Sequence, residues 1–146
     1  MKARSAGVLL RRDDGKVLLV HPGGPFWARK DAGAWSIPKG EYSDGEEDVR
    51  ECARREFEEE LGVAPPAELT DLGTVRQKNG KEVRAFLGSG DLDVSAAVSN
   101  TFTIEWPPRS GRMQEFPEVD RADWFDVDVA REKLNPAQAA FLDRLP

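Results

Sequence analysis

The chain has 146 residues, of which 39% are apolar and 33% are charged; this is typical of one globular domain over residues 1–146 and excludes a disordered chain. Acidic residues outnumber basic ones by 27 to 21, so the formal net charge of −6 argues against binding to DNA or RNA. One cysteine, Cys52, and one histidine, His21, exclude an internal disulfide and a pair of histidine ligands. We therefore expect a cytoplasmic protein, because the first apolar run, 8–10, is also too short for a signal peptide or a membrane span.

Short apolar runs bounded by turn residues predict a series of strands. The sequence 13–16 and the Asn79-Gly80 pair are each typical of a tight turn, so two antiparallel hairpins are expected. Prolines and glycines predict a loop over residues 22–33. The expected strands are, in chain order, 6–10, 17–20, 35–37, 69–77, 83–87, 101–106 and 122–125.

Two helices are expected among these strands. Residues 48–61 contain neither proline nor glycine, their apolar residues recur at helical spacing, and Gly62 follows as a helix-ending residue. A final helix is predicted to begin at Asn135-Pro136. Several strands with one central and one terminal helix predict an α+β fold, an α/β/α sandwich with a mixed β-sheet.

The central helix and the loop before it are strongly acidic. Residues 40–63 hold ten acidic residues against three arginines, whereas residues 1–39 hold eight basic residues against three acidic ones. A cationic stretch followed by an anionic one suits a site that combines a metal ion with an anionic substrate.

Three glutamates of the predicted helix form one cluster. At about 100° per residue, Glu60 overlaps the apolar arc of the helix, Glu56 borders this arc, and Glu59 is adjacent. Clustered carboxylates repel one another unless a cation or an arginine neutralises them, and oxygen ligands without histidine or thiolate favour Mg²⁺ or Mn²⁺. We therefore expect a metal site here, with Glu51 and Glu58 on the solvated face.

Residues 40–63 resemble the Nudix box, which runs glycine, five residues, glutamate, seven residues, and then Arg-Glu-apolar-x-Glu-Glu-x-Gly-apolar. The second half matches position by position as Arg55-Glu56-Phe57-Glu58-Glu59-Glu60-Leu61-Gly62-Val63. The first half is one residue longer than the box. Glu47 has the family's spacing to Arg55 and Glu46 has its spacing to Gly40, so either glutamate could orient the arginine.

Further segments extend this resemblance to a bacterial subgroup of predicted NTP pyrophosphohydrolases; they are residues 21–27, 35–40 and 106–120. The resemblance implies a Nudix-type fold and hydrolysis of a pyrophosphate bond in a nucleoside diphosphate linked to another moiety. The implied partner is thus a small nucleotide-type molecule, with no nucleic acid polymer and no membrane, and the protein is expected to be a monomer or a homodimer.

The resemblance also implies roles for individual residues of the box. Glu59 and Glu60 would bind the metal, Glu56 would bind metal or act as a base, and Arg55 would orient a carboxylate. Gly40 would offer its carbonyl to the metal. Catalytic candidates are therefore Arg55, Glu56 and Glu59, and the metal candidates are Gly40, Glu56, Glu59 and Glu60.

Four residues outside the acidic helix are candidates for substrate binding. Lys39 stands beside the predicted metal loop, and Arg109 and Arg112 flank a glycine in a loop where guanidinium groups suit phosphate, although surface arginines are equally ordinary. Trp27 suits stacking on a base or closure of its loop over the core. The role of Glu118 stays open between a distal base, a metal ligand, a solvated side chain and a salt-bridge partner of Arg121.

The substrate and two alternative functions also stay open. A Trp-x-x-Pro-Lys-Gly arrangement over residues 35–40 suggests a dinucleoside polyphosphate hydrolase, but no tyrosine follows the box at the spacing such enzymes often show. A nucleotide-sensing module without catalysis is the alternative from another class, and the intact Arg55 and glutamates argue against it. His21 and Cys52 are expected to be structural.

Overall fold

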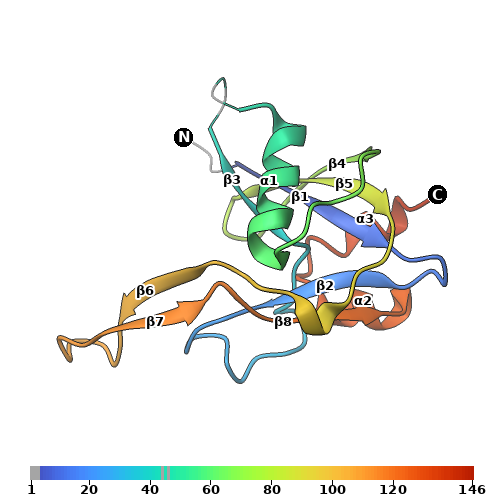
Figure 1. Ribbon diagram of the computed structural model, residues 1–146. Helices are drawn as coiled ribbons and strands as arrows, with labels where there is room; N and C mark the ends of the chain where they lie inside the picture. The colour runs from blue at the N-terminus through green and yellow to red at the C-terminus, as the bar shows by residue number, and fades with distance from the viewer. Residues whose placement is uncertain (1–3, 44, 46) are drawn as a thin grey trace.

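The computed structural model describes residues 4–43, 45 and 47–146 (Figure 1). The predicted role of Glu46 therefore lies outside the described residues. None of the helices in the described part of the chain has the length and apolar character needed to cross a membrane. In chain order the elements are β1 (Arg4–Arg11), β2 (Val17–Pro22), β3 (Lys39–Tyr42), α1 (Val49–Leu61), β4 (Thr70–Arg76), β5 (Glu82–Ser89), the 3₁₀ turn η1 (Val94–Ala96), β6 (Thr101–Glu105), β7 (Met113–Pro117), β8 (Val119–Phe125), α2 (Val127–Lys133) and α3 (Ala140–Asp143).

Six of the strands form one mixed sheet. Its order is β4-β5-β1-β2-β8, and β3 pairs with β1 off this path. β1 runs parallel to β5, whereas the pairs β1–β2, β1–β3, β2–β8 and β4–β5 are antiparallel. β6 and β7 form a separate hairpin that projects from the body of the molecule (Figure 1).

Both faces of the sheet are covered, which confirms the expected α/β/α arrangement. Successive strand residues point to opposite faces, so Val8 packs with the buried side of α1 while its neighbour Leu9 packs with α2 and α3. Phe57 lies at the centre of the α1 side and Phe141 on the other side, and both are fully buried.

The structure corrects several element predictions. Residues 35–37 form only isolated bridges, from Ser36 to Val20 and from Trp35 to Leu134, and the strand proper comes later, as β3. β7 and α2 were not expected. The terminal helix is short: α3 has four residues, and it begins after a turn region rather than at Asn135-Pro136.

The buried side chain of Gln138, from the C-terminal segment, forms hydrogen bonds with the residues that lead into β3. Gln138 accepts a hydrogen bond from the Ile37 amide at 3.0 Å, and its own amide donates to Ser36 Oγ and Gln77 Oε1, both at 3.0 Å. Because Gln138 is fully buried, these bonds satisfy groups that would otherwise be desolvated without a partner.

Candidate active site

Helix α1 begins and ends as its sequence predicts. The Asp48 side chain accepts from the Glu51 amide at 3.3 Å, and Gly62 adopts φ 79°, a left-handed conformation that ends the helix without the strain a side chain would add. The helix buries Cys52, Phe57 and Leu61 against the sheet. Its three candidate glutamates are intermediate in exposure, at the border of this buried face.

Glu56 lies directly against the backbone of Gly40. β3 pairs with β1 so that Gly40 stands opposite Ala6, on the face of the sheet that α1 covers. A Cβ atom at Gly40 would lie 1.8 Å from Glu56 Oε1, so no other residue fits without moving that carboxylate. Burial, followed by the charge of Glu59, raises the pKa of Glu56.

Arg55 joins the glutamates into one ionic network. It donates two hydrogen bonds to Glu47, from Nε at 2.9 Å and from Nη2 at 2.8 Å, in the bidentate geometry that suits a guanidinium. Its Nη1 contacts Glu56 Oε2 at 2.5 Å and both oxygens of Glu59 at 3.3 Å. Glu47 thus occupies the arginine-facing position that the sequence left open between two glutamates.

Glu60 is the most desolvated member of the cluster. Burial raises its pKa to about 8, although a backbone hydrogen bond from Lys39 and the Lys39 charge act in the opposite direction. Its Oε2 atom is buried and has no hydrogen-bond partner among the described residues. A buried carboxylate oxygen without a partner is costly unless a cation or a proton joins it.

The charge of Glu118 adds a small contribution to the raised pKa of Glu60. Backbone bonds link it to α1: the Asn100 amide donates to the Glu59 carbonyl at 3.0 Å, and the Glu118 amide donates to the Asn100 carbonyl at 2.8 Å. The Glu118 residue is exposed, and Arg121 makes its described ion pair with Asp120 instead, at 4.0 Å. The β7–β8 turn thus adds a further carboxylate beside the α1 cluster.

Lys39 is placed differently from its neighbour Gly40. It stands opposite Gly7, and consecutive strand residues point to opposite faces, so its side chain leaves β3 on the face away from α1. Burial, and next the charge of Lys81, lower the pKa of Lys39.

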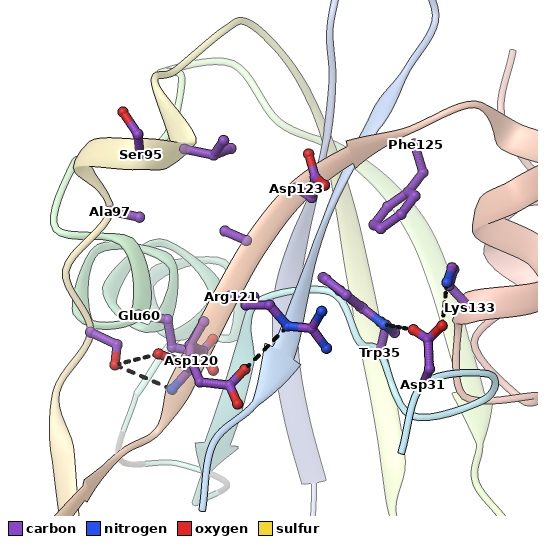
Figure 2. A pocket seen from close by; sticks show the side chains of 14 residues that line it. Asp31, Trp35, Glu60, Ser95, Ala97, Asp120, Arg121, Asp123, Phe125 and Lys133 are labelled. Atoms are coloured by element: carbon purple, nitrogen blue, oxygen red, sulfur yellow. Dashed lines mark hydrogen bonds and ion pairs between the residues drawn. The ribbon is translucent and has the colours of Figure 1, made fainter. Parts of the chain in front are cut away.

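A hollow of about 500 Å³ runs across strand β8. Figure 2 shows Glu60 and Ser95 on one side of the β8 ribbon and Trp35, Asp31 and Lys133 on the other. The hollow is lined by Asp31, Trp35, Glu60, Val94, Ser95, Ala97, Ser99, Val119, Asp120, Arg121, Ala122, Asp123, Phe125 and Lys133.

The far side of this hollow has an aromatic and cationic wall. The guanidinium of Arg121 lies 5.1 Å from the ring centre of Trp35, and the rings of Trp35 and Phe125 meet edge to face at 5.0 Å. Asp31 accepts from the Trp35 indole at 2.7 Å and pairs with Lys133 at 2.5 Å. Sequence reasoning missed Arg121 and Lys133. The pairing of β8 with β2 brings Arg121 to the cavity, and the contacts of Lys133 with Asp31 and with the Trp35 amide bring in the end of α2.

The other predicted substrate residues do not belong to this wall. Trp27 is 40% exposed, and the Lys30 ammonium lies 5.1 Å from the centre of its ring. Arg109 and Arg112 are exposed in the turn of the β6–β7 hairpin. These three are not among the described residues that line the hollow.

A divalent cation fits the donor set, although the described residues show no group of three His, Cys, Asp or Glu side chains already arranged around a metal position. Arg55 accounts for this, because it holds Glu56 and Glu59 turned toward itself. The buried Glu60 oxygen, which has no partner among the described residues, is a group that a bound cation would satisfy. Cys52 is no candidate, because burial raises the pKa of its thiol to about 11.

The family is shown by comparison with known proteins. The model of the NUDIX domain matches residues 1–145, and the chain therefore belongs to the NUDIX family. It is 32% identical to the mRNA-decapping enzyme subunit 2 of Saccharomyces cerevisiae over 94 residues, 64% of this chain but 8% of that protein. It is 31% identical over 88 residues to an uncharacterized 17.7 kDa protein of Enterobacteria phage T4, 59% of this chain and 58% of that protein. The chain thus spans less than two thirds of either relative.

Solved structures show the same fold at low sequence identity. A C. elegans Ap4A hydrolase binary complex has a TM-score of 0.63 at 20% identity, covering 96% of this chain and 93% of that one. The NUDIX domain of Shewanella oneidensis NrtR complexed with ADP ribose has a TM-score of 0.66 at 18% identity, covering 99% and 86%.

Proposed function

We propose that the chain is a pyrophosphohydrolase that uses Mg²⁺, or Mn²⁺, to cleave a phosphoanhydride bond in a nucleoside diphosphate linked to another moiety. The observation that carries this proposal is Glu60. Its buried carboxylate has an oxygen without a partner among the described residues, and it lines the hollow across β8. A site that keeps a buried carboxylate unpaired is suited to a cation that arrives with an anionic substrate.

The ion would be held by Glu56, Glu59, Glu60 and the Gly40 carbonyl, an all-oxygen set that suits a hard cation. When bound, such an ion neutralises the diphosphate and lowers the pKa of water. Glu56 would then bind it or accept a proton from the attacking water. Its raised pKa favours the second role, because a base works best with a pKa near the working pH.

Arg55 would keep these carboxylates in place. Its bidentate contact with Glu47 fixes the guanidinium, which leaves Nη1 to orient Glu56 and Glu59. A fixed arginine also offsets the mutual repulsion of the glutamates before a metal binds.

The substrate would lie along the hollow, with its phosphates on the Glu60 side. Arg121 and Lys133 are the cations that line the cavity, and Trp35 and Phe125 give it apolar surface for a base or a sugar. Lys39, Trp27, Arg109 and Arg112 are kept as further candidates for contact with substrate, outside the cavity wall.

A dinucleoside polyphosphate is the second candidate substrate. The hollow continues over β8 from Glu60 to Lys133, and a substrate with a nucleoside at each end would use both sides of the strand. One similar structure is that of an Ap4A hydrolase, which is a likeness in fold.

A panel of nucleotides tests the proposal and separates the two candidates. Each compound is incubated with and without Mg²⁺, and released phosphate is measured after a coupling phosphatase. We expect turnover of nucleoside diphosphate derivatives only with the metal. Turnover of dinucleoside polyphosphates alone would favour the second candidate, and no Mg²⁺-dependent turnover of any compound would contradict both.

A further inference from the structure

His21 is buried behind the wall of the hollow, with both ring nitrogens bonded. Its side chain is 0% exposed. Nδ1 lies 2.8 Å from Asp120 Oδ1, and Nε2 lies 2.6 Å from the backbone oxygen of Lys30. The imidazole also meets the ring of Trp35 edge to face at 5.2 Å.

Both partners of the ring nitrogens are hydrogen-bond acceptors, and this bears on the protonation state of the ring. A backbone carbonyl has no proton to donate, and a carboxylate is also an acceptor. A neutral imidazole has one N–H and can satisfy only one of them. With Asp120 ionised, both short contacts are hydrogen bonds only if both nitrogens carry hydrogen, so that His21 is an imidazolium whose charge Asp120 balances.

Two of the three groups that His21 contacts line the hollow, and the third is next to a residue that does. Asp120 and Trp35 line it directly, and Lys30 is followed by Asp31, which also lines it. Asp120 belongs to β8, whereas Lys30 and Asp31 belong to the loop between β2 and β3. A backbone bond already links the start of this loop to the residue before β8, from the Gly23 amide to the Glu118 carbonyl at 2.9 Å. His21 adds a second link farther along the loop, between Asp120 and Lys30.

We propose that His21 is a positioning residue for the substrate cavity: as an imidazolium bonded to Asp120 and to the Lys30 carbonyl, it fixes the loop that carries Asp31 against strand β8. This inference rests on the proposed function only in taking the hollow as the substrate site.

The charged groups around the ring leave Asp120 as its counter-ion. Asp31 is engaged by the Trp35 indole and by Lys133, so it does not compete for the imidazole. Arg121 is 4.0 Å from Asp120, farther than His21. The charged groups that face this region are Asp120, Arg121 and Asp123 from β8, Lys30 and Asp31 from the loop, Lys133 from α2 and, across the hollow, Glu60 from α1.

Nuclear magnetic resonance tests the protonation state without any variant. His21 is the single histidine of the sequence, so the ring ¹⁵N signals need no assignment. At pH 7 we expect both nitrogens at the shifts of a protonated imidazolium. One nitrogen at the shift of an unprotonated ring nitrogen would overturn the proposal. In Asp120→Asn, which removes the balancing charge, we expect the neutral ring at the same pH.

A matched pair of variants tests the positioning role. His21→Gln keeps an N–H donor on its amide group but loses the charge and the ring, and we expect amide hydrogen exchange in residues 27–31 to speed up by about tenfold or more. Gln138→Leu removes a buried hydrogen-bonding side chain that does not line the hollow, and it should lower Tm while leaving exchange in this loop unchanged. Equal acceleration in both variants, or none in His21→Gln, would contradict the proposal.

Kinetics links the wall to substrate binding. With a nucleotide that the wild type turns over, His21→Gln should raise KM by about tenfold while kcat changes by less than about twofold, and Gln138→Leu should leave KM unchanged. An unchanged KM in His21→Gln would overturn the link to the substrate. A protein without any turnover would contradict the proposed function, while the ring shifts and the loop exchange would still decide the role of His21.

Discussion

The protonation of Glu60 should make the metal-free protein less stable as pH rises. Burial raises the pKa of Glu60 from 4.5 to about 8 in the folded state, so the folded protein binds this proton more tightly than the unfolded chain does. The stabilising contribution is fully present below pH 4.5 and is lost as pH rises to about 8. Thermal unfolding measured in chelator at a series of pH values from about 5 to about 9 should show a Tm that falls as pH rises. In Glu60→Gln the fall should be smaller, and an identical fall would show that other groups cause it.

Charge removal at Glu60 and at Glu59 should have different effects on stability but the same effect on activity. Above the Glu60 pKa of about 8, Glu60→Gln removes a buried charge, so in chelator at such a pH we expect a Tm at or above that of the wild type. Glu59→Gln loses the 3.3 Å contact with Arg55 and should have a slightly lower Tm. The free energy of unfolding should fall by at most about 1 kcal/mol, because the ion pair is partly exposed. Turnover should fall at least about tenfold in both, with a smaller Mg²⁺-induced rise in Tm. A variant that keeps full activity would show that its carboxylate is not a metal ligand.

The contact between Gly40 and Glu56 can be tested with one methyl group. In Gly40→Ala the added Cβ would meet Glu56 Oε1 at 1.8 Å, so the carboxylate must move and turnover should fall by about tenfold or more. Gly90→Ala is the matched control, because its Cβ would meet its nearest neighbour, Pro66 Cγ, at an ordinary 3.4 Å. Steady-state kinetics and Mg²⁺ titrations followed by Tm measure the difference. If Gly40→Ala has the same turnover and Mg²⁺ response as the control, the position of the Glu56 carboxylate does not matter for the reaction.

At the scale of elements, strand β8 and the β6–β7 hairpin offer rival positions for a phosphate-binding arginine. Arg121 lines the hollow, whereas Arg109 and Arg112 are in the hairpin turn. We expect Arg121→Ala to raise KM by about tenfold or more, as the loss of a charge-assisted hydrogen bond of roughly 1.5–3 kcal/mol predicts. The double variant Arg109→Ala, Arg112→Ala should change KM less. The reverse order would move the phosphate site to the hairpin, and unchanged KM in both would exclude the three arginines.

Local sequence was sufficient to predict helix α1 but not the strand before it. The helix has a cap at Asp48, an apolar stripe and Gly62, all within one stretch of chain. β3 contains Lys39, Gly40 and Glu41, which do not alternate between apolar and polar residues. It is a strand because its backbone pairs with β1. α2 was missed because most of its seven residues are exposed, so its apolar pattern is weak.

For the whole molecule, the family and the glutamate cluster could be predicted, while the cavity could not. The box residues lie within one helix turn or two of each other, and their spacing alone brings Arg55 to the glutamates. The cavity instead combines Glu60 of α1 with residues as distant in the sequence as Lys133 of α2, which meet through long-range contacts such as the pairing of β2 with β8. Without knowledge of these long-range contacts, the sequence does not indicate that Arg121 lines a cavity or that Asp120 and the Lys30 carbonyl bond to His21.

The requirement for a divalent metal is the central claim, and removal and return of the metal test it most directly. Hydrolysis of the best nucleotide from the panel is measured with Mg²⁺, then after excess chelator, and again after Mg²⁺ is restored above the chelator. Because the candidate ligands are all oxygen atoms of a hard-cation site, we predict that turnover stops with chelator and returns with the metal. Hydrolysis that continues at the same rate in chelator would contradict the account.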